Sequence, residues 1–94
     1  MTYKLKFIPT ALKEWEKLDN SVRKLFKSKL SERLEAPHVA SSRLSGFDNH
    51  YKIKIRASGY RLVYEVIEKE IVILVIAVGK REKGTVYKKA RDRK

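Results

Sequence analysis

Residues 51–64 constrain the fold more than any other stretch, because two alternating segments there flank a turn signal. Apolar and cationic side chains alternate strictly through the first segment, in the order Tyr51, Lys52, Ile53, Lys54, Ile55 and Arg56. A period of two is typical of a strand with one face on a core. Three cations on the other face repel one another, so we expect a negatively charged partner opposite them.

The second segment repeats this pattern after a turn signal at residues 57–59. Its apolar positions are Tyr60, Leu62, Tyr64 and Val66. For both apolar faces to share one core, Ile55 must pair with either Tyr60 or Leu62. The first register sets Lys54 opposite Arg61, and the second sets Arg56 there. In either register Arg61 joins the row of cations.

Residues 71–78 form an unbroken apolar run, Ile-Val-Ile-Leu-Val-Ile-Ala-Val. A short run of β-branched residues is typical of a strand buried on both faces. The short connection at 68–70 predicts that this strand folds back antiparallel on the preceding one, which places Val78 near Tyr60 and residues 80–81 near Arg61. Four cations are therefore predicted to converge at one end of the sheet: Lys52, Lys54, Arg61 and Arg81.

The rest of the chain predicts one more strand and three helices. Residues 3–8 alternate as a strand, and Pro9 opens a helix whose apolar spacing runs to Leu18. Ser21 is a candidate N-cap for a second helix. The apolar positions of that helix are Val22, Leu25, Phe26, Leu30 and Leu34. A loop is expected over 35–50 and a short helix from Thr85.

This order, β-α-α-β-β-β-α, predicts a small α+β domain over residues 1–94. We expect a mostly antiparallel four-stranded sheet, with the two N-terminal helices packed on one face and a short C-terminal helix.

The charge of the chain limits its partners. With 23 Lys and Arg against 11 Asp and Glu, the formal charge is +12, which favours a polyanion or an acidic protein. No stretch has the ~20 apolar residues of a membrane span, and the N-terminus lacks a signal-peptide apolar region. The chain has no cysteine, and neither His38 nor His50 has partners at a metal-ligand spacing. We expect a cytoplasmic protein without metal or cofactor.

Cations also cluster outside the strands. The second helix carries Arg23, Lys24, Lys27 and Lys29 on its outer face. A solvated helix face is the ordinary explanation, and contact with phosphate is the alternative. The candidate contacts to RNA or ribosomal RNA are Arg23, Lys24, Lys27, Arg43, Arg56 and Lys80.

Five segments, in this order and at these intervals, resemble the RelE family of bacterial toxins, within the RelE/ParE superfamily. They are Ala-Leu-Lys-Glu-Trp at 11–15, Tyr-Lys-Ile-Lys-Ile-Arg at 51–56, Ser-Gly-Tyr-Arg-Leu-Val-Tyr at 58–64, Val-Gly-Lys-Arg-Glu at 78–82 and Val-Tyr at 86–87. The resemblance implies a toxin that cuts mRNA in the ribosomal A site, and a RelB-like antitoxin that blocks it. It also implies catalytic roles for Lys52, Lys54, Arg61, Arg81 and Tyr87. The sequence departs from similar toxins at Ser45, where they carry a basic residue, and at its charged ending, 91–94.

Cleavage at a 2′-hydroxyl needs a base, positive charge at the phosphate and an acid for the leaving oxygen. Neighbouring cations lower the pKa of a lysine, so Lys54 is the candidate base. Arg81 can act as the acid only towards a very basic leaving oxygen, while Arg61 and Lys52 would hold the phosphate. Tyr87 would stack on a base or orient the 2′-hydroxyl. Two other functions stay open: a ParE-like gyrase poison and a non-catalytic RNA-binding domain.

Overall fold

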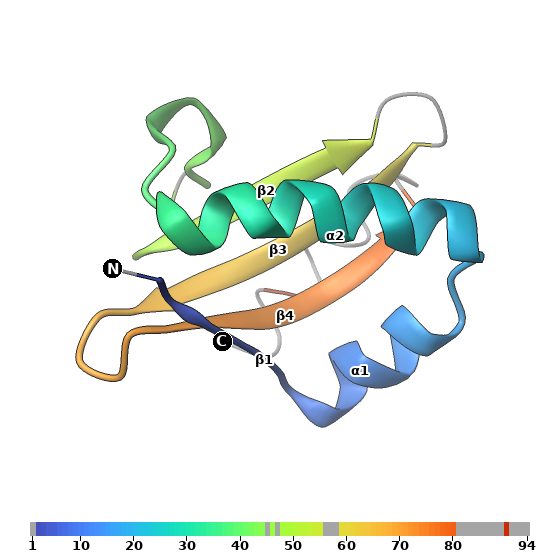
Figure 1. Cartoon of the computed structure of the whole chain (residues 1–94), viewed down its shortest axis with the longest axis horizontal. Coiled ribbons are helices and arrows are strands. Elements are labelled where there is room, and N and C mark those ends of the chain that lie inside the picture. Colours follow the sequence, from blue (N-terminus) through green and yellow to red (C-terminus); the bar gives the residue numbers. More distant parts are fainter. Residues whose placement is uncertain (1, 45, 47, 56–58, 81–89, 91–94) are drawn as a thin grey trace.

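The protein, seen here as a computed structural model, is a four-stranded sheet with two helices (Figure 1). The structure describes residues 2–44, 46, 48–55, 59–80 and 90. Its elements are β1 (Lys4–Phe7), α1 (Pro9–Glu16), α2 (Asn20–Glu35), the 3-10 turn η1 (Ala40–Ser42), β2 (His50–Ile55), β3 (Tyr60–Ile67) and β4 (Val72–Lys80). The strand order is β1-β4-β3-β2, with β1 parallel to β4 and the other pairs antiparallel. The predicted α+β sheet-and-helix architecture is confirmed, whereas the helix predicted from Thr85 lies outside the described residues except for Ala90.

The first residues of the two helices were predicted correctly for α1 and wrongly for α2. Pro9 occupies the first turn of α1, where its missing N–H costs no hydrogen bond. The predicted N-cap at Ser21 is wrong, because α2 begins at Asn20, so Ser21 lies inside the helix and Asp19 holds the N-cap position without a side-chain hydrogen bond. Among the described residues, no helix is long and apolar enough to cross a membrane.

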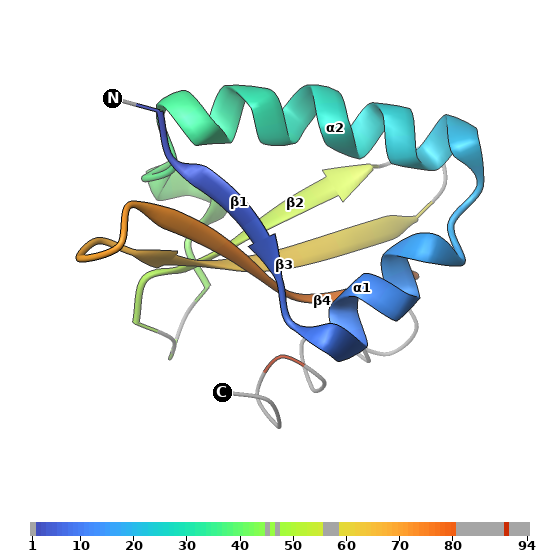
Figure 2. The same ribbon diagram turned by 60° about the horizontal axis from the view of Figure 1, so that its bottom comes forward.

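The main core lies between the helices and one face of the sheet, which we call the helix face. Val22, Phe26 and Leu30 of α2 are buried there at intervals of four residues, against strand residues such as Ile53. Leu25 was predicted to join this stripe but is 49% exposed, because it lies about 100° around the helix from Phe26. Figure 2 shows α2 lying along the sheet and α1 beside the end of β4.

A bulge in β4 divides the apolar run between the two faces of the sheet. Val63 pairs with Ala77 and Tyr64 with Val75, so Ile76 is the extra residue that forms the bulge on β4. Both Ile76 and Ala77 are buried in a second, smaller cluster on the opposite face, with Leu44, Val63 and Ala90. The prediction of a strand buried on both faces is therefore confirmed.

The bulge also shifts the pairing that follows it. Val78 pairs with Leu62, while the partner of Tyr60 is Lys80. The sequence had placed Val78 near Tyr60, since no residue in the apolar run signals the extra position.

Candidate nucleic-acid interface

The register of β2 and β3 decides which cations lie together. Ile55 pairs with Tyr60 and Lys54 with Arg61, which is the first of the two registers that the sequence allowed. Lys52 lies one pair further along on the same face, because residues two apart on a strand share a face. Lys52, Lys54 and Arg61 thus form a row on the face opposite the helices, which we call the cationic row.

The three members of the cationic row differ in exposure. Lys54 is exposed and Lys52 is half-buried, whereas Arg61 is only 9% exposed. On β4 the residue opposite Arg61 is Gly79, and without the bulge it would be Val78. The bulge therefore puts a residue without a side chain opposite Arg61 on the neighbouring strand. A charge so shielded from water attracts an anion more strongly than an exposed one does.

Arg33 of α2 was not predicted as a functional residue, yet it joins α2 to β2, β3 and η1. Its Nη1 donates to Tyr64 Oη at 2.9 Å and to the Lys52 carbonyl at 3.4 Å, and its Nη2 donates to Ser42 Oγ at 3.2 Å. From the sequence it was one more cation on a basic helix. A signal was available, since Arg33 lies three residues after buried Leu30 and so near the core stripe.

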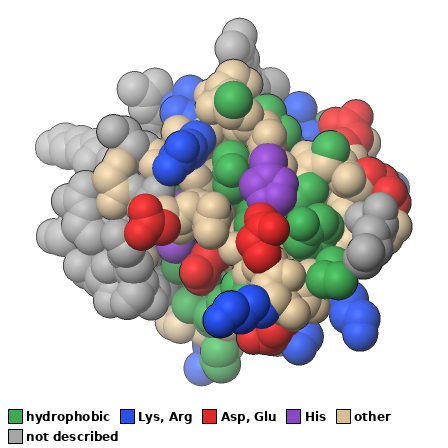
Figure 3. Space-filling model, turned by 90° about the vertical axis from the view of Figure 1, so that its left-hand side faces the viewer, with side chains coloured by type: hydrophobic (Ala, Val, Ile, Leu, Met, Phe, Trp, Pro, Cys, Tyr) green, Lys and Arg blue, Asp and Glu red, His purple; other side chains and the backbone are tan. Residues whose placement is uncertain are grey.

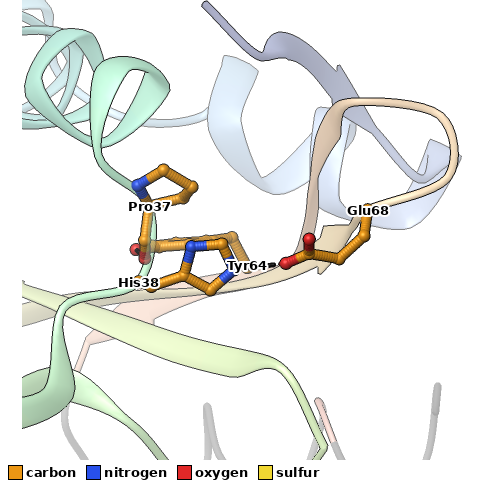
Figure 4. Close-up of polar contacts among 4 residues, drawn as sticks. All are labelled: Pro37, His38, Tyr64 and Glu68. Carbon is orange, nitrogen blue, oxygen red and sulfur yellow. Dashed lines mark hydrogen bonds and ion pairs between the residues drawn. The ribbon is translucent and has the colours of Figure 1, made fainter. Parts of the chain in front are cut away.

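Tyr64 anchors this arrangement from the core. Its hydroxyl accepts from Arg33 and donates to the Pro37 carbonyl at 2.8 Å, a contact drawn in Figure 4. Burial raises the pKa of Tyr64 above its ordinary value, and the Arg33 hydrogen bond partly opposes this shift. The hydroxyl therefore stays protonated at neutral pH, where it remains a donor to Pro37.

The remaining predicted contact residues are spread over the surface. Lys24 and Lys27 are exposed on α2, near half-buried Arg23. Arg43 is exposed just after η1, where it forms an isolated bridge with Tyr51. Lys80 is exposed at the end of β4, with its Nζ 5.5 Å from the Tyr60 ring centroid, so it shares the helix face with Tyr60 and not the cationic row. Three predicted residues lie outside the described part of the chain: Arg56, Arg81 and Tyr87.

The two histidines have partners that the sequence did not suggest. His38, which lies between α2 and η1, pairs with Glu68 in the turn between β3 and β4, and Figure 4 shows the two side chains pointing toward each other. Figure 3 shows histidine and acidic side chains next to apolar ones on this side of the molecule. His50 is buried and donates from Nδ1 to the Asp48 carbonyl at 2.6 Å. No group of three or more potential metal ligands occurs among the described residues.

Comparison with known proteins places the chain in a family. A family model described as the ParE toxin of type II toxin-antitoxin systems, parDE, matches residues 5–84. The mRNA interferase toxin RelE of Escherichia coli K12 is 52% identical over 93 residues, which cover 99% of this chain and 98% of that protein. The chain belongs to the RelE family of the RelE/ParE toxins.

Solved structures of RelE toxins share the fold. A variant of E. coli RelE in the free state, with two arginines replaced by alanine, matches with a TM-score of 0.92 at 50% identity, over 99% of this chain and 98% of that one. RelE in the intact E. coli RelBE toxin-antitoxin complex matches with a TM-score of 0.83 at 52% identity, over 85% of this chain and 98% of that one. The cationic row thus belongs to a RelE-family toxin.

Proposed function

We propose that the protein is an mRNA interferase, a toxin that cuts mRNA in the ribosomal A site and so arrests translation. The observation that carries this proposal is the 52% identity, over 99% of the chain, to the mRNA interferase toxin RelE. The pairing of Lys54 with Arg61 supports it, because two cations side by side can stabilise charge that develops on a phosphate.

The proposed reaction is attack of a 2′-hydroxyl on the adjacent phosphorus, which breaks the bond to the 5′-oxygen and leaves a cyclic phosphate. Lys54 takes the hydroxyl proton, and Arg61 and Lys52 hold the non-bridging oxygens. Arg81 protonates the leaving oxygen and Tyr87 stacks on a base. These last two roles rest on the family resemblance.

The ribosome has a defined part in this proposal. The cationic row consists of two lysines and one arginine, which stabilise negative charge well but transfer protons slowly at neutral pH. Alignment of a reacting group is worth about 7–11 kcal/mol of barrier. A site that is weak in acid-base groups depends on mRNA held in the right geometry, and the ribosome would supply that geometry in the cytoplasm.

A RelB-like antitoxin is the proposed inhibitor. The RelE protein of E. coli has been solved in complex with RelB. The +12 charge of this chain suits an acidic partner segment, which would neutralise its basic surface. We also propose that residues 1–94 act as one toxin domain.

Cut-site mapping tests the proposed function. Purified protein is added to mRNA-programmed ribosomes and to the same mRNA without ribosomes, and cuts are located by primer extension. We expect cuts at the A-site codon and nearly intact naked mRNA. Comparable cutting of naked mRNA would contradict the ribosome's role.

The name of the matching family model favours one alternative, a ParE-like gyrase poison. A supercoiling assay with DNA gyrase separates the two. Translation arrest without mRNA cuts, together with gyrase inhibition, would support the alternative.

A further inference from the structure

A groove runs along the outer edge of β2, between that edge, α2 and η1. Its volume is about 360 Å³. It is lined by Lys29, Arg33, Ser41, Ser42, Lys52, Ile53 and Lys54. Four of these seven residues are cations and none is acidic, so the groove is suited to an anion.

Arg33 is held in this groove by hydrogen bonds, and among the described residues none of its acceptors is a carboxylate. Its hydrogen-bond acceptors are Tyr64 Oη, the Lys52 carbonyl and Ser42 Oγ, all of which are neutral. A guanidinium has five N–H donors, so donors remain for a ligand after these contacts. Because the side chain is already held, little further conformational entropy is lost when it binds an anion.

Lys29 adds a second cation from the same helix. It lies four residues before Arg33 on α2, and residues at that spacing are neighbours on one helix face. Lys29 is exposed, so it can move to meet a ligand.

The backbone carbonyls of β2 favour a phosphate over an extended acidic peptide as the anion in the groove. The His50 carbonyl accepts from the Leu44 N–H at 2.9 Å, and the Lys52 carbonyl accepts from Arg33. These carbonyls lie on the outer edge, where an added peptide strand would need to donate its own N–H groups. A peptide strand would have to compete for these two carbonyls, whereas a ligand that only accepts hydrogen bonds would not. A phosphate is such a ligand, whereas an extended acidic peptide is not.

We propose that this groove is a phosphate-binding subsite for the RNA strand, in which Lys29 and Arg33 hold a phosphate next to the one that is cleaved. The proposal rests on the proposed function, because Lys52 and Lys54 belong both to the groove and to the cationic row. An RNA strand whose scissile phosphate lies on the cationic row would pass around the edge of β2 into the groove. The subsite would fix the register of the strand relative to Lys54.

Titration of the free protein tests the subsite without cleavage. The probe is a trinucleotide with 2′-O-methyl groups, which has no 2′-hydroxyl to react, and binding is followed through amide NMR signals. We expect shifts at Lys29, Ser42 and Lys54. Lys29→Gln should weaken binding about 5–10-fold and reduce the salt slope by about one unit.

Lys69→Gln is the matched control, because it removes the same charge from an exposed site in the turn between β3 and β4. Equal weakening by Lys29→Gln and Lys69→Gln would overturn the proposal. Arg33→Lys keeps the charge but loses the planar fork, so it should weaken binding even where thermal melting shows an intact fold. Tighter binding of an acidic peptide in the groove would show that the ligand class is wrong.

The second test uses ribosome-bound mRNA in which single phosphates are replaced by neutral methylphosphonates. At one position beside the cut bond, the replacement should weaken binding about 5–10-fold in the parent and in Lys69→Gln, with no further loss in Lys29→Gln. If the loss of affinity from the methylphosphonate adds to the loss from Lys29→Gln at every position, the proposed subsite is wrong. If the parent fails to cut ribosome-bound mRNA, the proposed function fails, while the trinucleotide titration still decides the groove.

Discussion

Lys54 and Arg61 face each other across two strands but differ in exposure, which suits them to different tasks. Exposed Lys54 can reach a substrate and exchange its proton, whereas buried Arg61 keeps its charge in place. We predict that Lys54→Ala lowers the single-turnover cleavage rate by ~10²–10⁴-fold and changes ribosome binding little. The measurement is cleavage by saturating toxin on programmed ribosomes. Cleavage at the parent rate would make Lys54 a phosphate anchor only.

Removal of the Tyr64 hydroxyl tests how much its hydrogen bonds to Arg33 and Pro37 stabilise the fold. Tyr64→Phe removes one hydroxyl, so the Pro37 carbonyl loses one of its two donors and the Arg33 guanidinium loses one of its three acceptors. We expect the free energy of unfolding to fall by about 1–3 kcal/mol, measured by urea denaturation. Tyr3→Phe is the control, since Tyr3 is also half-buried, packs against the main core and contacts His38 edge-on. A similar loss of unfolding free energy in both variants would mean that the hydrogen bonds of the Tyr64 hydroxyl add no stability of their own.

The Tyr64 hydroxyl should also make the free energy of unfolding depend on pH. Burial raises the pKa of Tyr64 above 10.0 in the folded protein, so the folded state keeps this proton when the unfolded chain has lost it. The resulting stability is complete below the unfolded pKa and disappears as pH rises through the folded one. The difference in unfolding free energy between the parent and Tyr64→Phe should therefore shrink above pH ~10. A difference that grows with pH would contradict this sign.

At the scale of elements, the sequence predicted what depends on periodicity. The alternation through 51–56 identified β2 and its two faces, and parity left only two registers with β3. The bulge at Ile76 was missed because every residue around it is apolar, so an extra position leaves no mark in the pattern. The role of Arg33 was missed because it depends on Tyr64, Ser42 and the Lys52 carbonyl, which only the folded chain brings together.

The smaller cluster, which the bulge places on the face opposite the helices, should be disrupted without disturbing the main core. Ala90 is fully buried beside Val63 and Ala77, so Ala90→Asp would bury an unpaired carboxylate there. We expect local release of Ala90, with methyl NMR signals of Val63 and Ile76 shifting while those of Ile53 and Val75 in the main core stay in place. Ala40→Asp, at an exposed site, is the control. Shifts that spread through both clusters would show that they fold as one unit.

At the scale of the whole molecule, the excess of cations predicts how the toxin finds its target. Lys24 and Lys27 lie on the outer side of α2, away from the cationic row, so they are suited to attract phosphate without taking part in cleavage. We predict that Lys24→Ala and Lys27→Ala each weaken ribosome binding and reduce its salt slope by about one unit, because each lost contact releases one counterion fewer. The cleavage rate at saturation should stay at the parent value.

Binding measured at several salt concentrations, alongside single-turnover cleavage, checks this prediction. Lys13→Ala is the matched control, since Lys13 is an exposed lysine on the other helix. If Lys13→Ala changes the salt slope as much as Lys24→Ala, the attraction comes from net charge and not from the α2 surface. If Lys24→Ala or Lys27→Ala slows cleavage at saturation, that lysine contributes to the reaction itself, and the separation of binding on α2 from chemistry on the cationic row is wrong.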